Sequence, residues 1–185
     1  MRLFNRLNHK RLVDAIGPQS DLQYDSLTLY GLARYSRARS LIEVGCDKGT
    51  STQALLLALE ENGGNELISI NPHIEIKYLI EDPNLRIVKT KYTKKALNSA
   101  LKRIPIQFVF INSCEHIDHI SFLLNYIIEK LENGGMVVIH DIRKFSVEII
   151  PIIQDNIISE YDHETLEYYD CPDSEKGLGI IQRKH

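Results

Sequence analysis

Two groups of polar residues, each after an apolar run, carry side chains that could perform acid–base chemistry. His116 lies in the segment that follows the run at residues 108–111, and His140 and Asp141 follow the run at residues 136–139. If these runs are adjacent strands, their ends bring the three side chains within reach of one another. Histidine suits a general base near neutral pH, and a carboxylate can orient it or a substrate hydroxyl. We therefore expect His116 as base or substrate contact, Asp141 as the orienting group, and His140 as the second candidate base.

Two other interpretations of these residues stay open. His116 and His119 could simply begin the following helix and face water. Together with Cys114 and His140 they could also hold zinc, although their spacing matches no common zinc motif.

A glycine-rich segment could bind an anionic or zwitterionic group. In the sequence EVGCDKGTST, Gly45 and Gly49 allow a tight turn and a close approach of a ligand to the main chain. Thr50 or Ser51 can cap the helix that follows, whose first N–H groups favour a carboxylate. The segment lacks the Gly-Lys-Ser/Thr of a Walker loop and the third glycine of the dinucleotide fingerprint. A strand-to-helix turn without a ligand is the alternative.

The apolar runs that must position these residues are nearly continuous in Val, Ile, Leu and Phe. Such runs are typical of strands covered on both faces, and therefore of a parallel sheet with helices on either side. Five runs have this character and two further strands are expected near the end: residues 41–44, 67–70, 85–88, 108–111 and 136–139, then 165–169 and 179–183. The alternation of strands and helices predicts an α/β fold with a doubly wound, mostly parallel seven-stranded sheet.

Helices are expected between the strands and before the first one. A stripe of apolar residues indicates a helix over residues 117–131, which the segment Asn133-Gly134-Gly135 would end. The other expected helices span residues 5–16, 21–38, 50–61 and 146–159. Since no linker or repeat divides the chain, we expect residues 1–185 to form one domain, with an N-terminal helical segment at 1–38 and the core at 39–185.

Several segments resemble, in the same order, the class I S-adenosylmethionine-dependent methyltransferases, in the branch of small-molecule O-methyltransferases. Glu43, Gly45 and Gly49 match the family's motif E/D-x-G-x-x-x-G. The likeness extends over roughly residues 21–182 through the segments ELISIN, FVFINSCEHIDHISFLLNYIIEKLENGGMVVIHDI and GLGIIQ. The resemblance implies a Rossmann-like methyltransferase fold and S-adenosylmethionine as the cofactor.

The resemblance also implies roles for residues of the glycine-rich segment. Gly45 and Gly49 would border the methionine part of the cofactor, and Ser51 would lie near its carboxylate. Glu43 would support the loop from the strand. Asp47 is a further expected cofactor contact, with a solvated loop charge as the alternative.

Two positions depart from the family's pattern. The second strand usually ends in a carboxylate that accepts hydrogen bonds from both ribose hydroxyls, but here it ends at Asn71, a neutral and therefore weaker acceptor. Asn112 stands where metal-dependent members have an Asp, which there joins an Asp-Asn pair replaced here by Asp141 and Ile142. One Asp and one Asn are few ligands for a hard cation. We expect Asn71 and Asn112 to contact the cofactor, and we expect no divalent metal.

Bulk composition narrows the range of partners. A formal net charge of −3 gives no reason to expect nucleic acid, and no apolar run is long enough to cross a bilayer. The cysteines, at positions 46, 114 and 171, form no CxxC pair, and such a sparse set suits a reducing compartment, so we expect a cytoplasmic protein. The lysines between residues 89 and 95 are expected to be solvated, with an anionic ligand as the alternative. The expected partner is a small molecule, and the sequence leaves a homodimer open.

The leading functional hypothesis is an S-adenosylmethionine-dependent methyltransferase that acts on a small molecule by O-methylation. The alternative is a catalytically degenerate methyltransferase-like domain that serves as a binding or assembly module, which Asn71 and Asn112 favour. The glycine-rich segment and the group of His116, His140 and Asp141 argue against that alternative.

Overall fold

The computed structural model describes residues 23–46, 49–72, 80–102, 104–112, 117–142, 151, 166–171 and 177–184. Within these residues the helices are α2 (Gln23–Ser36), α3 (Thr50–Glu61), α4 (Lys94–Ala100) and α5 (Ile117–Ile128). The strands are β1 (Ser40–Val44), β2 (Glu66–Asn71), β3 (Leu85–Lys89), β4 (Ile106–Ile111), β5 (Leu131–His140), β6 (Leu166–Cys171) and β7 (Leu178–Arg183).

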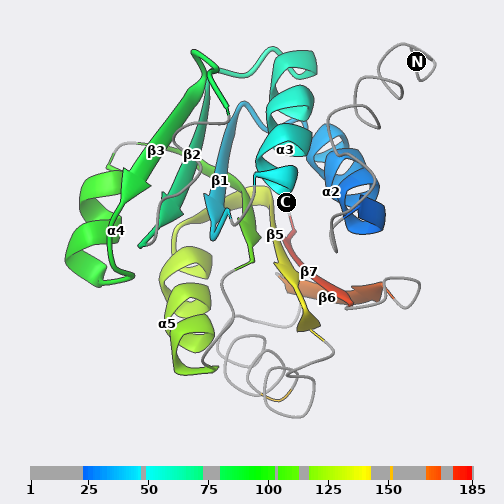
Figure 1. Cartoon of the computed structure of the whole chain (residues 1–185). Helices are drawn as coiled ribbons and strands as arrows, with labels where there is room; N and C mark the ends of the chain where they lie inside the picture. The colour runs from blue at the N-terminus through cyan, green and yellow to red at the C-terminus, as the bar shows by residue number, and fades with distance from the viewer. Residues whose placement is uncertain are drawn as a thin grey trace.

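The strands form one seven-stranded sheet in the order β3-β2-β1-β4-β5-β7-β6 (Figure 1). The first five pair in parallel, whereas β7 runs antiparallel to both β5 and β6. This confirms the predicted doubly wound, mostly parallel sheet. Strand order reverses between β1 and β4, and sheets of this kind bind ligands outside the carboxyl ends of the strands at that point. The two strands are joined there by a hydrogen bond of 2.8 Å from the Asn112 N–H to the Val44 carbonyl oxygen.

Alternate residues of the buried strands face two different layers of helices. One core cluster joins Ile42 and Val44 of β1 to residues of α4 and α5, and the other joins Leu41 to residues of α2 and α3. Figure 1 shows these two pairs of helices on opposite sides of the sheet. Since successive side chains of a strand alternate between faces, Glu43 shares the face of Leu41. Polar residues on this face therefore meet α2 and α3.

Side chains of α2 tie this helix to the end of α3. The Tyr30 hydroxyl donates to Glu61 Oε2 at 2.6 Å, and the Arg34 Nε lies 2.8 Å from the same oxygen. Arg34 also donates to the Asn62 side-chain oxygen. Burial raises the pKa of Tyr30 to about 12, and the neighbouring Glu61 carboxylate adds to the rise. These contacts hold α2 over the sheet face that carries Glu43.

The prediction that a glycine pair ends a helix over residues 117–131 is wrong. The helix α5 stops at Ile128, and Leu131 already begins β5. The pairing of β5 with β4 shifts register within the following segment, where Gly134 has a φ of 75°. The Asn-Gly-Gly segment therefore lies inside the strand and forms an irregularity in it, because glycine allows the left-handed backbone that such a bulge needs.

Other element boundaries were predicted closely, with one helix missed. The described part of the helix expected over residues 21–38 is α2, and β6 and β7 lie where the last two strands were expected. The missed helix, α4, has seven residues, of which only Leu97 and Ala100 are buried, so it shows little periodicity. The helices expected over residues 5–16 and 146–159 lie outside the described residues, apart from Pro151.

None of the described helices combines the length and the apolar character needed to cross a membrane.

Candidate functional site

The segment between β1 and α3 is a tight turn built on two glycines. Gly45 has a φ of 83° and donates its N–H to the Ile70 carbonyl oxygen of β2 at 2.9 Å. Gly49 has a φ of 85° and donates its N–H to the Cys46 carbonyl oxygen at 2.7 Å. Both φ values lie in the region that residues with a side chain rarely adopt. The geometry of the turn thus explains why both positions are glycine. Asp47, the cofactor contact expected between them, lies outside the described residues.

The helix α3 begins directly after this turn, and Gly49 is its N-cap residue with no side-chain cap. The expectation that Thr50 or Ser51 caps the helix is therefore wrong. The first N–H groups of a helix have no partner inside the helix and carry partial positive charge. The start of α3, at the carboxyl end of β1, is thus suited to a carboxylate or another anionic group.

Glu43 lies beneath the turn, fully buried in β1. Its carboxylate accepts hydrogen bonds from the hydroxyls of Ser51 at 2.5 Å, Thr52 at 2.7 Å and Ser69 at 2.7 Å. Burial raises the pKa of Glu43 above its ordinary value, although the three hydroxyl donors oppose the rise. The structure thus gives Glu43 a place in the scaffold of the turn. The Ser51 hydroxyl, expected near the cofactor's carboxylate, is buried and directed at Glu43.

Asn71 ends β2 beside the glycine turn, at the position where the family usually has an acid. Its amide nitrogen donates to the Cys46 sulfur at 3.2 Å, and the residue is half-buried. Burial raises the pKa of the Cys46 thiol. Cys46 is therefore held as a neutral thiol that packs against the end of β2.

Asn112 and His140 end the neighbouring strands β4 and β5 on the face that α2 and α3 cover. Ile111 pairs with Ile139, so the two residues that follow are cross-strand neighbours. The Asn112 Oδ1 lies 2.8 Å from Nδ1 of the His140 ring. The other ring nitrogen, Nε2, lies 3.0 Å from Asp25 Oδ2. His140 is only 3% exposed, so both its nitrogens are engaged inside the protein.

Sequence reasoning missed Asp25, which lies in α2. It is buried, as is Leu29 one helical turn later on the same face. An acidic residue on the buried face of an expected helix signals a partner in the core, because buried charges are paired. That pattern could have identified Asp25 as a functional candidate, although not its partner.

Asp141 follows His140 with a φ of 64°, the left-handed conformation that few non-glycine residues adopt. It is half-buried at the carboxyl edge of the sheet. Unusual backbone of this kind is often found at functional sites. His116, its expected partner, lies outside the described residues together with Cys114. Within the part of the chain that the structure describes, no three His, Cys, Asp or Glu side chains are arranged to hold a metal ion.

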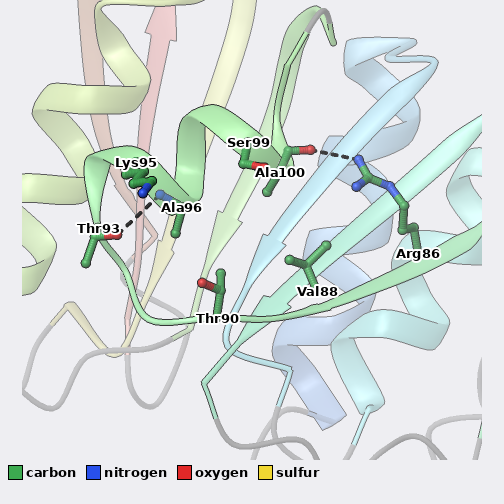
Figure 2. A pocket seen from close by; sticks show the side chains of 8 residues that line it. All are labelled: Arg86, Val88, Thr90, Thr93, Lys95, Ala96, Ser99 and Ala100. Carbon is green, nitrogen blue, oxygen red and sulfur yellow. Dashed lines mark hydrogen bonds between the residues drawn. The ribbon is translucent and has the colours of Figure 1, made fainter.

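The lysines at positions 89, 91, 94 and 95 are exposed, as the solvated-face interpretation predicts. Figure 2 shows the pocket beside them, between β3 and α4, with Val88 on the strand, Thr90 just after it, and Lys95 and Ser99 on the helix. Its volume is about 410 Å³, and its lining contains none of the residues expected to bind the cofactor or to act in catalysis. Arg86, at one end, is already engaged with Glu66 and with the Ala100 carbonyl oxygen.

The model of a protein family described as a methyltransferase domain matches residues 42–142 of the chain. The matched region runs from β1 to the residue after Asp141, and so contains the glycine turn and the ends of β2, β4 and β5. No curated protein matches the sequence.

Solved structures of methyltransferases align with nearly the whole chain. An O-methyltransferase from Bacillus cereus in complex with SAH is 14% identical, with a TM-score of 0.67 and coverage of 98% of this chain and 93% of that one. TomG, an O-methyltransferase from Streptomyces achromogenes in complex with SAM, is 15% identical, with a TM-score of 0.61 and coverage of 98% and 91%. MycE, from the mycinamycin biosynthetic pathway in complex with Mg, SAH and mycinamycin VI, is 12% identical, with a TM-score of 0.69 and coverage of 97% and 54%.

At these identities the structural likeness establishes the fold, and the family model matches more than half of the sequence. Together they show that the chain belongs to the class I S-adenosylmethionine-dependent methyltransferase family, as its glycine motif and the order of its matching segments indicated.

Proposed function

We propose that the protein is an S-adenosylmethionine-dependent methyltransferase that methylates a hydroxyl oxygen of a small molecule. The observation that carries this proposal is the turn after β1, where Gly45 and Gly49 both have positive φ values at the point where strand order reverses. Main-chain amides and the uncapped start of α3 gather there, and they suit the zwitterionic amino acid part of the cofactor.

The residues around the turn fit this cofactor. Gly45 and Gly49 would let the methionine part approach the main chain, and Asn71 would accept a hydrogen bond from the ribose through its amide oxygen. Asn112 would contact the cofactor from the end of β4. When bound, S-adenosylmethionine supplies the methyl group as an electrophile on its sulfonium. Ser51 and Glu43 would act indirectly, since their contact with each other stabilises the turn.

The acid–base roles are proposed for His116 and Asp141. His116 would take the proton of the acceptor hydroxyl, and Asp141 would orient His116 or that hydroxyl. The left-handed backbone of Asp141 supports a role beyond packing, because the conformation is unfavourable and needs a compensating benefit. His140 is better suited to positioning than to catalysis, because both its ring nitrogens are engaged by Asn112 and Asp25.

A small-molecule acceptor is supported by the family and by charge. MycE, which shares the fold, was crystallised with mycinamycin VI. A formal net charge of −3 does not favour a nucleic acid substrate.

A catalytically inactive binding module is the second candidate. The burial of His140, which removes one of the two candidate bases from the reach of a substrate, favours it. The neutral Asn71 favours it too, because a charged acceptor would bind the ribose more strongly.

Calorimetric titration with S-adenosylmethionine (SAM) and S-adenosylhomocysteine (SAH), the product that remains after methyl transfer, tests the proposal. We expect both to bind the wild-type protein, and we expect Gly45→Val to abolish measurable binding because a β-branched residue cannot adopt the φ of 83°. Gly31→Val is the matched control, since a Cβ at Gly31 meets nothing within 4 Å. Absence of wild-type binding at millimolar SAM and SAH would overturn the proposed function.

Turnover distinguishes the enzyme from the binding module. SAH release would be followed with a panel of hydroxylated small molecules, including sugars and catechols. Turnover that Asp141→Ala abolishes while SAH still binds supports the enzyme. Cofactor binding without turnover on any member of the panel supports the binding module.

A further inference from the structure

Three polar side chains from three elements form a continuous chain of close contacts from α2 to the carboxyl end of β4. The His140 Nε2 lies 3.0 Å from Asp25 Oδ2, and its Nδ1 lies 2.8 Å from Asn112 Oδ1. The side chains of His140 and Asp25 are 3% and 8% exposed. We call Asp25, His140 and Asn112 the polar chain.

The atoms that face the His140 ring determine how many protons it carries. Carboxylate and amide oxygens accept hydrogen bonds and cannot donate them, so a ring nitrogen that faces such an oxygen must carry a proton. His140 has an oxygen opposite each nitrogen, so both contacts are hydrogen bonds only in the ring form that carries a proton on Nδ1 and on Nε2. In that form of the ring, Asp25 would be the counter-ion that a buried cation requires.

An imidazolium at His140 fixes the orientation of the Asn112 amide. The amide oxygen accepts from Nδ1–H, so the NH2 group turns away from the ring. Asn112 is half-buried, and its NH2 group donates no hydrogen bond within the described residues. A neutral ring without a proton on Nδ1 would have the opposite effect, because the NH2 group would then face the ring and the oxygen would turn away.

We propose that His140 carries a proton on each ring nitrogen, and that Asp25 and His140 are positioning residues that hold Asn112 as a hydrogen-bond donor to the bound ligand. The proposal rests on the proposed function, since the ligand is the cofactor. An NH2 group at the end of β4 selects an oxygen or nitrogen with a free lone pair. It offers no oxygen to a divalent cation, which binds oxygen ligands. The helix α2 thereby contributes to ligand selection through a residue that does not itself touch the ligand.

Nitrogen-15 spectra of the His140 ring, assigned through the backbone, test the proton count. We expect two protonated nitrogens with similar shifts in the wild-type protein, and one protonated and one bare nitrogen in Asp25→Asn, which removes the counter-charge. Asp118→Asn is the matched control, because Asp118 is an exposed acid on α5. A single protonated nitrogen in the wild-type ring would overturn the proposal, and this measurement needs no variant to fold.

Calorimetry with SAH tests the positioning role. We expect Asp25→Asn and Asn112→Ala each to weaken binding by about tenfold, the effect of one lost hydrogen bond. The double variant should bind no more weakly than Asn112→Ala alone, because Asp25 acts through Asn112. A merely structural role for Asp25 would instead add its effect to that of Asn112→Ala, and additive losses would overturn the proposal. If wild-type protein does not bind SAH, the proposed function fails, and the ring spectrum alone decides the state of the polar chain.

Discussion

The buried carboxylate of Glu43 and the hydroxyl of Ser69 meet across two parallel strands, where the hydroxyl donates at 2.7 Å. The two residues are register partners in β1 and β2, so the pairing of the strands fixes the contact. Ser51 and Thr52 donate to the same carboxylate from the first turn of α3. One side chain thus joins two strands to the helix that begins at the glycine turn, and Glu43 supports the turn from below.

The stability that Glu43 contributes should fall as pH rises. Its pKa is raised by burial above the ordinary value of 4.5, so the folded state holds the proton more strongly than the unfolded chain. The contribution is full below the unfolded pKa and is lost as pH rises through the folded pKa, by about 1.4 kcal/mol for each pKa unit between them. The measurement is urea unfolding of the wild type and of Glu43→Gln from below the unfolded pKa to above the folded pKa. As pH rises, the free energy of unfolding of the wild type should fall relative to that of Glu43→Gln.

Ser69→Ala separates the charge from the hydrogen bonds. It removes one of the three donors that favour the ionised carboxylate, so the pKa of Glu43 should rise further and the pH dependence should extend to higher pH. A pH-independent difference between wild type and Glu43→Gln would show that the pKa of Glu43 is the same in the folded and unfolded states.

The sheet and the glycine turn could be predicted from the sequence because local chemistry determines them. Nearly continuous runs of buried β-branched residues are typical of the central strands of a parallel sheet, and Gly45 and Gly49 mark positive φ values that few other residues adopt. The polar ends of β2, β4 and β5 followed from the strands. The prediction for residues 133–135 is wrong, because glycines after an apolar helix are as compatible with a bulge as with a helix end.

The partners of the site residues could not be predicted, because they depend on which elements pack together. Asp25 and His140 are 115 positions apart, and nothing local indicates that α2 covers the end of β5. The direction of the Ser51 hydroxyl likewise depends on how α3 packs over Glu43. Periodicity identifies which face of an element is buried, but the contact on that face is a property of the tertiary structure.

Replacing Asp141 with glycine should stabilise the protein and remove its activity. The φ of 64° costs a residue with a side chain roughly 1 kcal/mol, and glycine avoids this cost. Asp141→Ala lacks the gain in stability, so the pair of variants separates backbone strain from loss of the carboxylate. Thermal unfolding and SAH release measure the two effects.

Arg37→Gly provides the matched control for Asp141→Gly. Arg37 has a φ of 54° just after α2, and it is exposed and outside the proposed site. It should gain comparable stability and keep full turnover. If Asp141→Gly also kept full turnover, Asp141 would have no part in the chemistry.

Tyr30 should ionise later than an ordinary tyrosine. Its pKa is raised to about 12 by burial and by the Glu61 carboxylate, so the stability it contributes is full below its ordinary pKa of 10.0 and is lost as pH rises towards 12. Because the chain contains nine tyrosines, the ionisation of Tyr30 is isolated as the difference between the ultraviolet absorbance titrations of the wild type and Tyr30→Phe. Glu61→Gln should lower the pKa of Tyr30 only part of the way to 10.0, because burial contributes more to the raised pKa than Glu61 does. A transition that returns fully to the ordinary value would make Glu61 the main cause.

Asn71→Asp should tighten the binding of S-adenosylmethionine. A carboxylate at the end of β2 would accept hydrogen bonds from the ribose hydroxyls as a charged group. Charge-assisted hydrogen bonds are roughly twice as strong as neutral ones. We therefore expect a gain of up to about tenfold in affinity. The change also removes the donor that the amide provides to the Cys46 sulfur at 3.2 Å. Because burial raises the pKa of Cys46, the sulfur keeps its proton and can donate it to the new carboxylate, so the turn should persist. Calorimetric titration of Asn71→Asp and Asn71→Ala against wild type measures the effect, with Cys46→Ala in the Asp background to isolate the thiol. Equal affinities for the wild type, Asn71→Asp and Asn71→Ala would show that the end of β2 does not contact the ribose. The proposed position of the cofactor would then have to be revised.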